Sequence, residues 1–117
     1  MRVLVSERDT LLRELVAQWL SEAGATAVTH ASAPVDAILV DISCQQDAHA
    51  TRASWRRAYP HAALVLVSAR FAHNAGADDA MASRLGVTRI LPKPFSRAAL
   101  WSALGLTKAR AAARPQP

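Results

Sequence analysis

Short, uninterrupted apolar runs recur along the chain, and a polar residue follows most of them. The clearest runs are residues 3–5, 37–40, 64–67 and 90–91. Runs without polar alternation are typical of parallel strands that are buried on both faces of a sheet. A short stretch rich in β-branched residues adds one more strand. We therefore predict five strands, at residues 3–6, 26–29, 36–41, 64–68 and 87–91.

Helical patterns alternate with these strands. After Asp9 or Thr10, which can serve as the N-cap, apolar residues recur every three or four positions up to Gly24. Capping residues and helix breakers predict three more helices, at residues 47–59, at residues 78–85 and after Ser96. The alternation of strands and helices predicts an α/β domain with a parallel sheet.

Three polar side chains lie at the ends of successive buried strands. Asp41 follows residues 37–40, Ser68 follows residues 64–67, and Lys93 comes directly after the last strand. Ligands of open α/β sheets bind at the carboxyl ends of the strands, so we expect these side chains to converge. A carboxylate, a hydroxyl and an ammonium together suit phosphoryl chemistry, with Asp41 as acceptor and Ser68 and Lys93 as donors to phosphoryl oxygens.

Composition limits the number of domains, the partners and the compartment that we expect for this protein. The 117 residues suffice for one domain, which we expect at residues 1–106, followed by a basic, disordered tail at residues 107–117. The net charge of +5 favours a solvated basic surface over nucleic-acid binding, because no aromatic residues interleave the basic ones. No run approaches the ~18 apolar residues of a membrane span, no signal segment opens the chain, and Cys44 is the lone cysteine. We therefore expect a cytoplasmic protein that uses no membrane.

The order of these features resembles the receiver domain of two-component response regulators. The resemblance covers residues 2 to about 105 and is carried by four segments, RVLVSERD, ILVD, LVSA and LPKPF. It implies a flavodoxin-like, three-layer fold with a five-stranded parallel sheet of order 2-1-3-4-5. It also implies that Asp41 is the phosphoacceptor, Ser68 the switch hydroxyl and Lys93 the essential lysine, with a cis bond to Pro94.

The metal site that the resemblance implies is altered in this chain. Receivers hold Mg²⁺ through two adjacent acids after the first strand, the acceptor aspartate and a backbone carbonyl two residues beyond it. Here these ligands would be Glu7, Asp41 and the carbonyl of Ser43, but Arg8 stands at the second acidic position. A guanidinium cannot ligate a metal, so we expect Mg²⁺ to bind weakly or not at all. A shifted alignment, with Ser6 and Glu7 at the acidic positions, requires a gap before the helix.

The chain has little room for the second helix of a receiver. Residues 25–40 accommodate two short strands and a connector, and residues 30–35 have no helical period. An extended connector of about six residues can cross one strand, since strands lie about 4.8 Å apart and rise about 3.3 Å per residue. We expect the second helix to be missing or reduced to a turn. Its loss should bare apolar surface, which a second copy would cover in a homodimer.

Two functions are compatible with these features. As a stand-alone receiver, the chain would accept a phosphoryl group on Asp41 from a histidine kinase or a histidine phosphotransfer protein and signal through protein contacts. It would then have no enzymatic activity beyond self-catalysed transfer to its own aspartate. As a phosphorylation-independent pseudo-receiver, it would be a scaffold or dimerisation module in which Arg8 pairs with Asp41 and replaces the cation.

Overall fold

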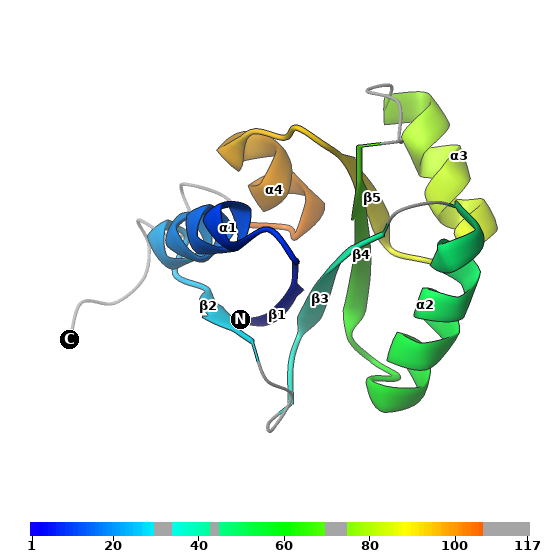
Figure 1. Cartoon of the computed structure of the whole chain (residues 1–117), viewed down its shortest axis with the longest axis horizontal. Coiled ribbons are helices and arrows are strands. Elements are labelled where there is room, and N and C mark those ends of the chain that lie inside the picture. The colour runs from blue at the N-terminus through cyan, green and yellow to red at the C-terminus, as the bar shows by residue number, and fades with distance from the viewer. Residues whose placement is uncertain (30–33, 43–44, 70–74, 107–117) are drawn as a thin grey trace.

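The sheet has five parallel strands in the order β2-β1-β3-β4-β5, as expected (Figure 1). The computed structural model describes residues 1–29, 34–42, 45–69 and 75–106, with the backbone alone at residues 45–48 and 75–79. The strands are β1 (Arg2–Ser6), β2 (Thr26–Val28), β3 (Ala37–Asp41), β4 (Ala63–Ser68) and β5 (Arg89–Pro92). All five predicted strands are therefore present.

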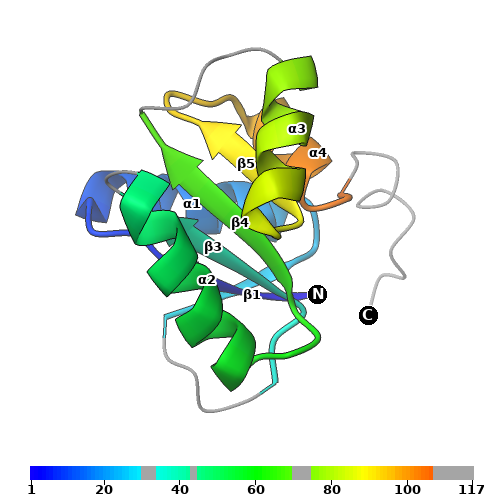
Figure 2. The same ribbon diagram turned by 90° about the vertical axis from the view of Figure 1, so that its right-hand side faces the viewer.

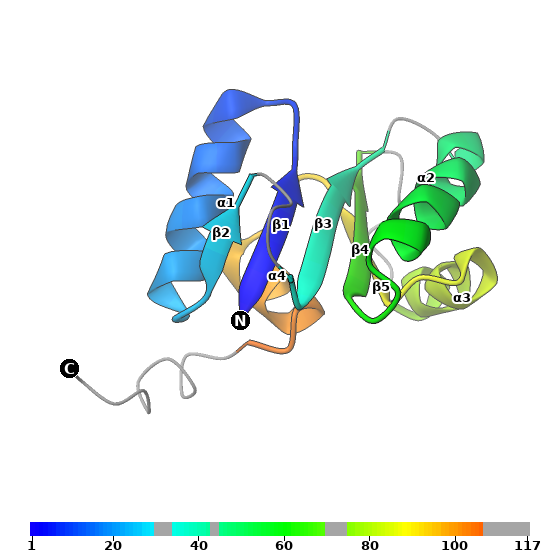
Figure 3. The same ribbon diagram turned by 90° about the horizontal axis from the view of Figure 1, so that it is seen from below.

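Four helices in the described part of the chain complete three layers. They are α1 (Thr10–Glu22), α2 (Gln45–Ala58), α3 (Ala75–Leu85) and α4 (Arg97–Ala103). Figures 2 and 3 show α2 and α3 together on one face of the sheet, and α1 and α4 lie on the other. None of these described helices is long and apolar enough to cross a membrane.

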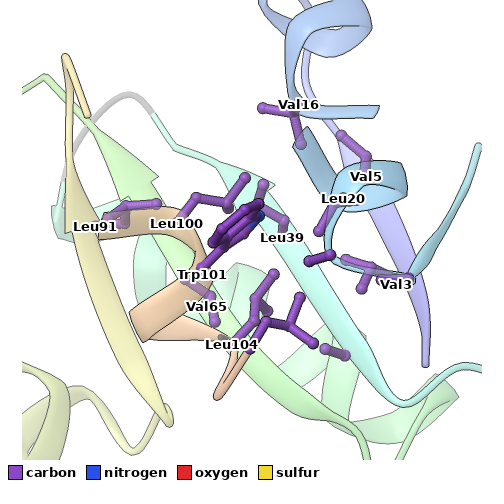
Figure 4. Close-up of a cluster of buried hydrophobic side chains, with 14 of the residues drawn as sticks. Val3, Val5, Val16, Leu20, Leu39, Val65, Leu91, Leu100, Trp101 and Leu104 are labelled. Atoms are coloured by element: carbon purple, nitrogen blue, oxygen red, sulfur yellow. The ribbon is translucent and has the colours of Figure 1, made fainter. Parts of the chain in front are cut away.

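Alternate strand residues contribute to two hydrophobic cores, one on each face of the sheet. In the first core, Val5, Leu39 and Val65 pack with Leu20 of α1 and Trp101 of α4 (Figure 4). The second core lies beneath α2 and α3, and its strand residues are Leu4, Ile38, Val40, Leu64, Leu66 and Ile90. Burial on both faces accounts for the unalternating apolar runs in the sequence.

The start of α1 is fixed directly after the end of β1. The Asp9 carboxylate accepts hydrogen bonds from the backbone N–H groups of Leu11 and Leu12, at 2.9 and 3.2 Å. Asp9 is therefore the N-cap, one of the two residues predicted for this role. This cap holds the short segment that contains Glu7 and Arg8 at the carboxyl edge of the sheet.

The connection from β2 to β3 is short and is anchored to β1. Its described residues, 29 and 34–36, form no helix, and residues 30–33 lie outside the described part. The Asp36 carboxylate accepts a hydrogen bond from the Arg2 backbone N–H at 2.7 Å, and the Arg2 side chain donates to the Pro34 carbonyl at 3.2 Å. As predicted, four helices rather than five surround the described sheet.

The expectation that this loss bares the sheet was wrong for the described residues. Leu4 and Ile38, which lie on the face that the missing helix would cover, are only 3 % and 1 % exposed. Val28 of the edge strand and Val35 of the connector pack against the same core. These two side chains therefore take over part of the covering that a helix would provide.

Candidate functional site

The strand register brings the carboxyl ends of β3, β4 and β5 to one edge of the sheet. Asp41 lies opposite Val67, and Ser68 lies opposite Pro92. The backbone N–H of Lys93 then donates to the Ser68 carbonyl at 3.0 Å. Asp41, Ser68 and Lys93 therefore lie at the same edge, as their positions in the sequence predicted.

Lys93 joins two carboxylates. Its ammonium lies 2.9 Å from an Asp41 oxygen and 2.9 Å from a Glu7 oxygen. The expected contact between Lys93 and Asp41 is thus present, and the bond between Lys93 and Pro94 is cis. The Lys93 side chain is 20 % exposed and that of Asp41 is 14 % exposed, so this ion pair is partly shielded from water.

The Lys93 ammonium is held in its charged form. Burial by itself lowers the pKa of Lys93, because it disfavours the ammonium. Hydrogen bonds to Asp41 and Glu7, together with the attraction of their charges, outweigh burial and raise the pKa above its ordinary value. Lys93 is therefore a permanent cation at neutral pH.

Glu7 is a buried part of the site. Its side chain is 6 % exposed, and one carboxylate oxygen contacts Lys93. The other oxygen accepts a hydrogen bond from the Asp9 backbone N–H at 3.0 Å, and the Glu7 carbonyl accepts one from the Arg13 guanidinium at 3.0 Å. The sequence predicted Glu7 at the site but missed Arg13, whose position in the helix gave no sign of this contact.

Arg8 extends along the rim of the site. Its side chain is 79 % exposed, and a terminal nitrogen lies 3.7 Å from the Asp41 oxygen that does not contact Lys93. The ungapped alignment expected a guanidinium near the acceptor aspartate, and this geometry agrees with it. Exposed pairs at this distance contribute little stability, so Arg8 influences the site mainly through its charge.

The surroundings of the two described carboxylates, Glu7 and Asp41, do not suit a divalent cation. Of the four carboxylate oxygens, those of Glu7 face Lys93 and the Asp9 N–H, and those of Asp41 face Lys93 and Arg8. An incoming ion would have to approach the two positive charges that lie beside these oxygens, those of Lys93 and Arg8. Within the described residues, no group of three or more His, Cys, Asp or Glu side chains could hold a metal.

Two further predicted positions are less informative. Ser68 is buried, at 2 % exposure, and its role as a switch hydroxyl stays a prediction. The Ser43 carbonyl, the third predicted metal ligand, lies outside the described residues, as does Cys44.

Comparison with known proteins reveals the fold. No protein-family model matches the sequence, and no curated protein matches it either. Among solved structures, a response regulator from Thermotoga maritima has a TM-score of 0.67 at 15 % identity, covering 89 % of this chain and 93 % of that one. This chain has the receiver-domain fold of response regulators.

Two other solved structures extend this comparison. The receiver domain of a sensor histidine kinase from Pseudomonas aeruginosa, with magnesium coordinated in its active-site cleft, has a TM-score of 0.63 at 20 % identity. It matches 89 % of this chain and 97 % of its own. A putative pilus assembly-related protein from Burkholderia pseudomallei has a TM-score of 0.63 at 22 % identity, over 99 % of this chain and 92 % of that one. The receiver fold thus spans nearly the whole described chain.

Proposed function

We propose that this chain is a receiver in two-component signalling and that Asp41 accepts a phosphoryl group from a histidine kinase or a histidine phosphotransfer protein. The observation that carries the proposal is the Lys93 ammonium, 2.9 Å from the Asp41 carboxylate at the carboxyl edge of the sheet. A lysine held there is positioned to pair with an oxygen of an arriving phosphoryl group. The receiver fold supports the same assignment.

The transfer requires only groups that the site and the donor supply. An Asp41 carboxylate oxygen attacks phosphorus while the P–N bond to the donor histidine breaks, and the imidazole leaves with the electron pair of that bond. Among the described residues, Lys93 and Arg8 are the cations paired with the carboxylate, so they would offset the charge that collects on the phosphoryl oxygens. Apart from this transfer to its own aspartate, the chain performs no enzymatic reaction.

The signal passes through protein contacts. Phosphorylation adds about −1.5 to −2 units of charge, which would draw Lys93 and Arg8 toward the new oxygens and weaken the contact between Lys93 and Glu7. Ser68, at the end of β4, is the hydroxyl assigned to the phosphoryl group in this rearrangement. The chain then acts as a stand-alone, cytoplasmic receiver whose output is the surface around β4 and β5.

Intact-mass spectrometry after incubation with acetyl phosphate tests the proposal. The unaltered protein should gain the mass of one phosphoryl group, and Asp41→Ala should gain none. The reaction is run with and without magnesium. The comparison shows whether phosphorylation of Asp41 requires this cation. If the unaltered protein gains no mass under either condition, the phosphoacceptor proposal is wrong.

A second candidate is a phosphorylation-independent pseudo-receiver that serves as a scaffold or dimerisation module. The position of Arg8 favours it, because the guanidinium and Lys93 already balance the charges of Asp41 and Glu7. The similarity to a protein described as pilus assembly-related leaves room for a role outside a phosphorelay. Under this alternative, Asp41→Ala would leave binding to the partner unchanged.

A homodimer is a separate part of the proposal. The predicted cause, a bare sheet face, is absent from the described residues, but α1 carries two exposed leucines one turn apart. Leu11 is 78 % exposed and Leu15 is 39 % exposed. Apolar pairs on an otherwise polar helix surface are suited to a protein contact. The dimer proposal therefore depends on this surface rather than on the connector between β2 and β3.

A further inference from the structure

A pocket lies next to the acceptor site, at the carboxyl ends of β1 and β2. Its volume is about 430 Å³, and its lining residues are Val5, Ser6, Glu7, Arg8, Arg13 and Thr29. Of the described lining residues, none is Asp41, Ser68 or Lys93, so the pocket is a neighbour of the phosphoacceptor site and not the same cavity. It shares Glu7 and Arg8 with that site.

Two arginines, Arg8 and Arg13, line the pocket and supply its positive charge. Arg13 is half-buried and held in place, because it donates to the Glu7 carbonyl at 3.0 Å and approaches the Thr10 hydroxyl at 3.5 Å. Arg8 is exposed and is also a lining residue of the pocket. A guanidinium has five N–H donors, and its planar fork matches the geometry of phosphate oxygens. The pair is therefore suited to a phosphate group.

The one carboxylate in the lining does not cancel this preference. Glu7 directs one oxygen to Lys93 and the other to the Asp9 backbone N–H, so both of its oxygens already have a hydrogen-bond donor. The described lining carries this one negative charge and the two positive charges of Arg8 and Arg13. The two arginines then leave the lining with a net positive charge toward a ligand.

The volume of the pocket and the polarity of its lining indicate what the phosphate is attached to. A volume of about 430 Å³ exceeds the needs of a free phosphate and lies in the range of about 300–1,000 Å³ that small organic ligands occupy. The lining residues include Ser6 and Thr29, which carry hydroxyl groups, and the described lining includes no aromatic residue on which a base could stack. We propose that this pocket binds a sugar phosphate.

Such a ligand would affect the acceptor site through Arg8. The Arg8 guanidinium lies 3.7 Å from Asp41, and Arg8 is also a lining residue of the pocket, so a bound phosphate would compete with Asp41 for it. Replacing Asp41 with a neutral residue should therefore leave Arg8 more available to the ligand. Asp41 is not among the described lining residues, and binding is measured on the unphosphorylated protein, so the two proposals can fail separately.

Isothermal titration calorimetry with ribose 5-phosphate tests the inference. We expect a dissociation constant below about 1 mM at low ionic strength, no binding of ribose, and clearly weaker binding of inorganic phosphate. Arg13→Gln and Arg8→Gln should each weaken binding by about tenfold or more, the loss of one charge-assisted contact. Because Arg8 is exposed, its replacement leaves the fold intact even if Arg13→Gln does not.

The matched control is Arg97→Gln, which removes the same charge far from the pocket. Arg97 pairs with Glu22, the last residue of α1, and neither residue is among the described lining residues, so this variant should bind ribose 5-phosphate as the unaltered protein does. Asp41→Asn should bind it equally well or more tightly. Absent binding, equal affinity for inorganic phosphate, or equal weakening by Arg97→Gln would each overturn the proposal.

Discussion

The two sides of the candidate site hold their positive charges in different ways. On the β5 side, Lys93 is 20 % exposed and contacts two carboxylates at 2.9 Å. On the β1 side, Arg8 is 79 % exposed and stays 3.7 Å from a single carboxylate oxygen. Lys93 is thus a partly buried cation held at the sheet edge by two carboxylates, and Arg8 is a solvent-exposed cation beside it.

This difference bears on the role proposed for each cation. A compact, shielded ammonium is suited to a particular phosphoryl oxygen, and its position depends on the core beneath it. A long, solvated guanidinium instead supplies a general positive potential, and it stands where the resemblance implies an acid for a metal ion. The β5 side therefore carries the lysine that the phosphoacceptor proposal requires, and on the β1 side a guanidinium stands at the second acidic position.

The largest expected effect concerns the β5 side. Lys93→Met should slow phosphorylation of Asp41 by acetyl phosphate by about 100-fold or more, the usual cost of removing one oriented donor to a developing charge. Intact-mass spectrometry over time measures the rate. Arg97→Gln, which removes a positive charge on α4, is the control and should react normally. A rate in Lys93→Met within a few fold of normal would contradict the role of Lys93.

Next in size is a contrast in stability between the two sides. Glu7→Gln should lower the free energy of unfolding by about 1–3 kcal/mol, because a buried acceptor between Lys93 and the Asp9 N–H is altered. Arg8→Gln should change it by no more than about 1 kcal/mol, as for other exposed pairs. Urea denaturation measures both. Equal losses would show that the two sides are not held differently.

A smaller effect is the pH dependence of the contribution of Lys93. Its pKa in the folded state is raised above the ordinary value of 10.5, since bonds to Asp41 and Glu7 outweigh burial. The resulting stability is fully present below pH 10.5 and is lost as pH rises through the folded-state pKa. The stability difference between the unaltered protein and Lys93→Met should thus be constant near neutral pH and shrink above pH 10.5. A difference that grows there would contradict this sign.

The smallest expected change is in assembly. Light scattering at micromolar concentration should detect a dimer, and the double variant Leu11→Gln with Leu15→Gln should weaken it without changing the phosphorylation rate. Exposed leucines contribute through apolar area, at about 25 cal/mol per Å². Replacing the exposed Gln18 of the same helix with Ala is the control. A monomer at these concentrations would end the dimer proposal.

Sequence reasoning predicted the sheet well for a physical reason. Runs such as 37–40 and 64–67 are buried on both faces, so their pattern depends little on the neighbouring elements. Helices α2 and α3 begin at Gln45 and Ala75, before the predicted starts at residues 47 and 78. The hydrophobic pattern did not predict these starts because the first turns have no apolar period. Helix ends depend on caps and loops more than on hydrophobic pattern.

The candidate site was predictable to a similar degree. Asp41 and Lys93 follow buried strands, so the parallel register alone brings them together. Three other features could not be predicted in the same way. They are the contact between Glu7 and Lys93, the hydrogen bond from Arg13 to the Glu7 carbonyl, and the adjacent pocket. They depend on the angle at which α1 leaves β1, which is set by tertiary packing and by the Asp9 cap.

Magnesium titration of the unaltered protein and of Arg8→Asp tests the central claim most directly. If Arg8 stands in place of the metal, calorimetry should detect little or no binding to the unaltered protein near neutral pH. Arg8→Asp adds a carboxylate beside Asp41 and removes the guanidinium, so it should bind magnesium at least about tenfold more tightly. Tight binding by the unaltered protein, or no gain in Arg8→Asp, would contradict the account.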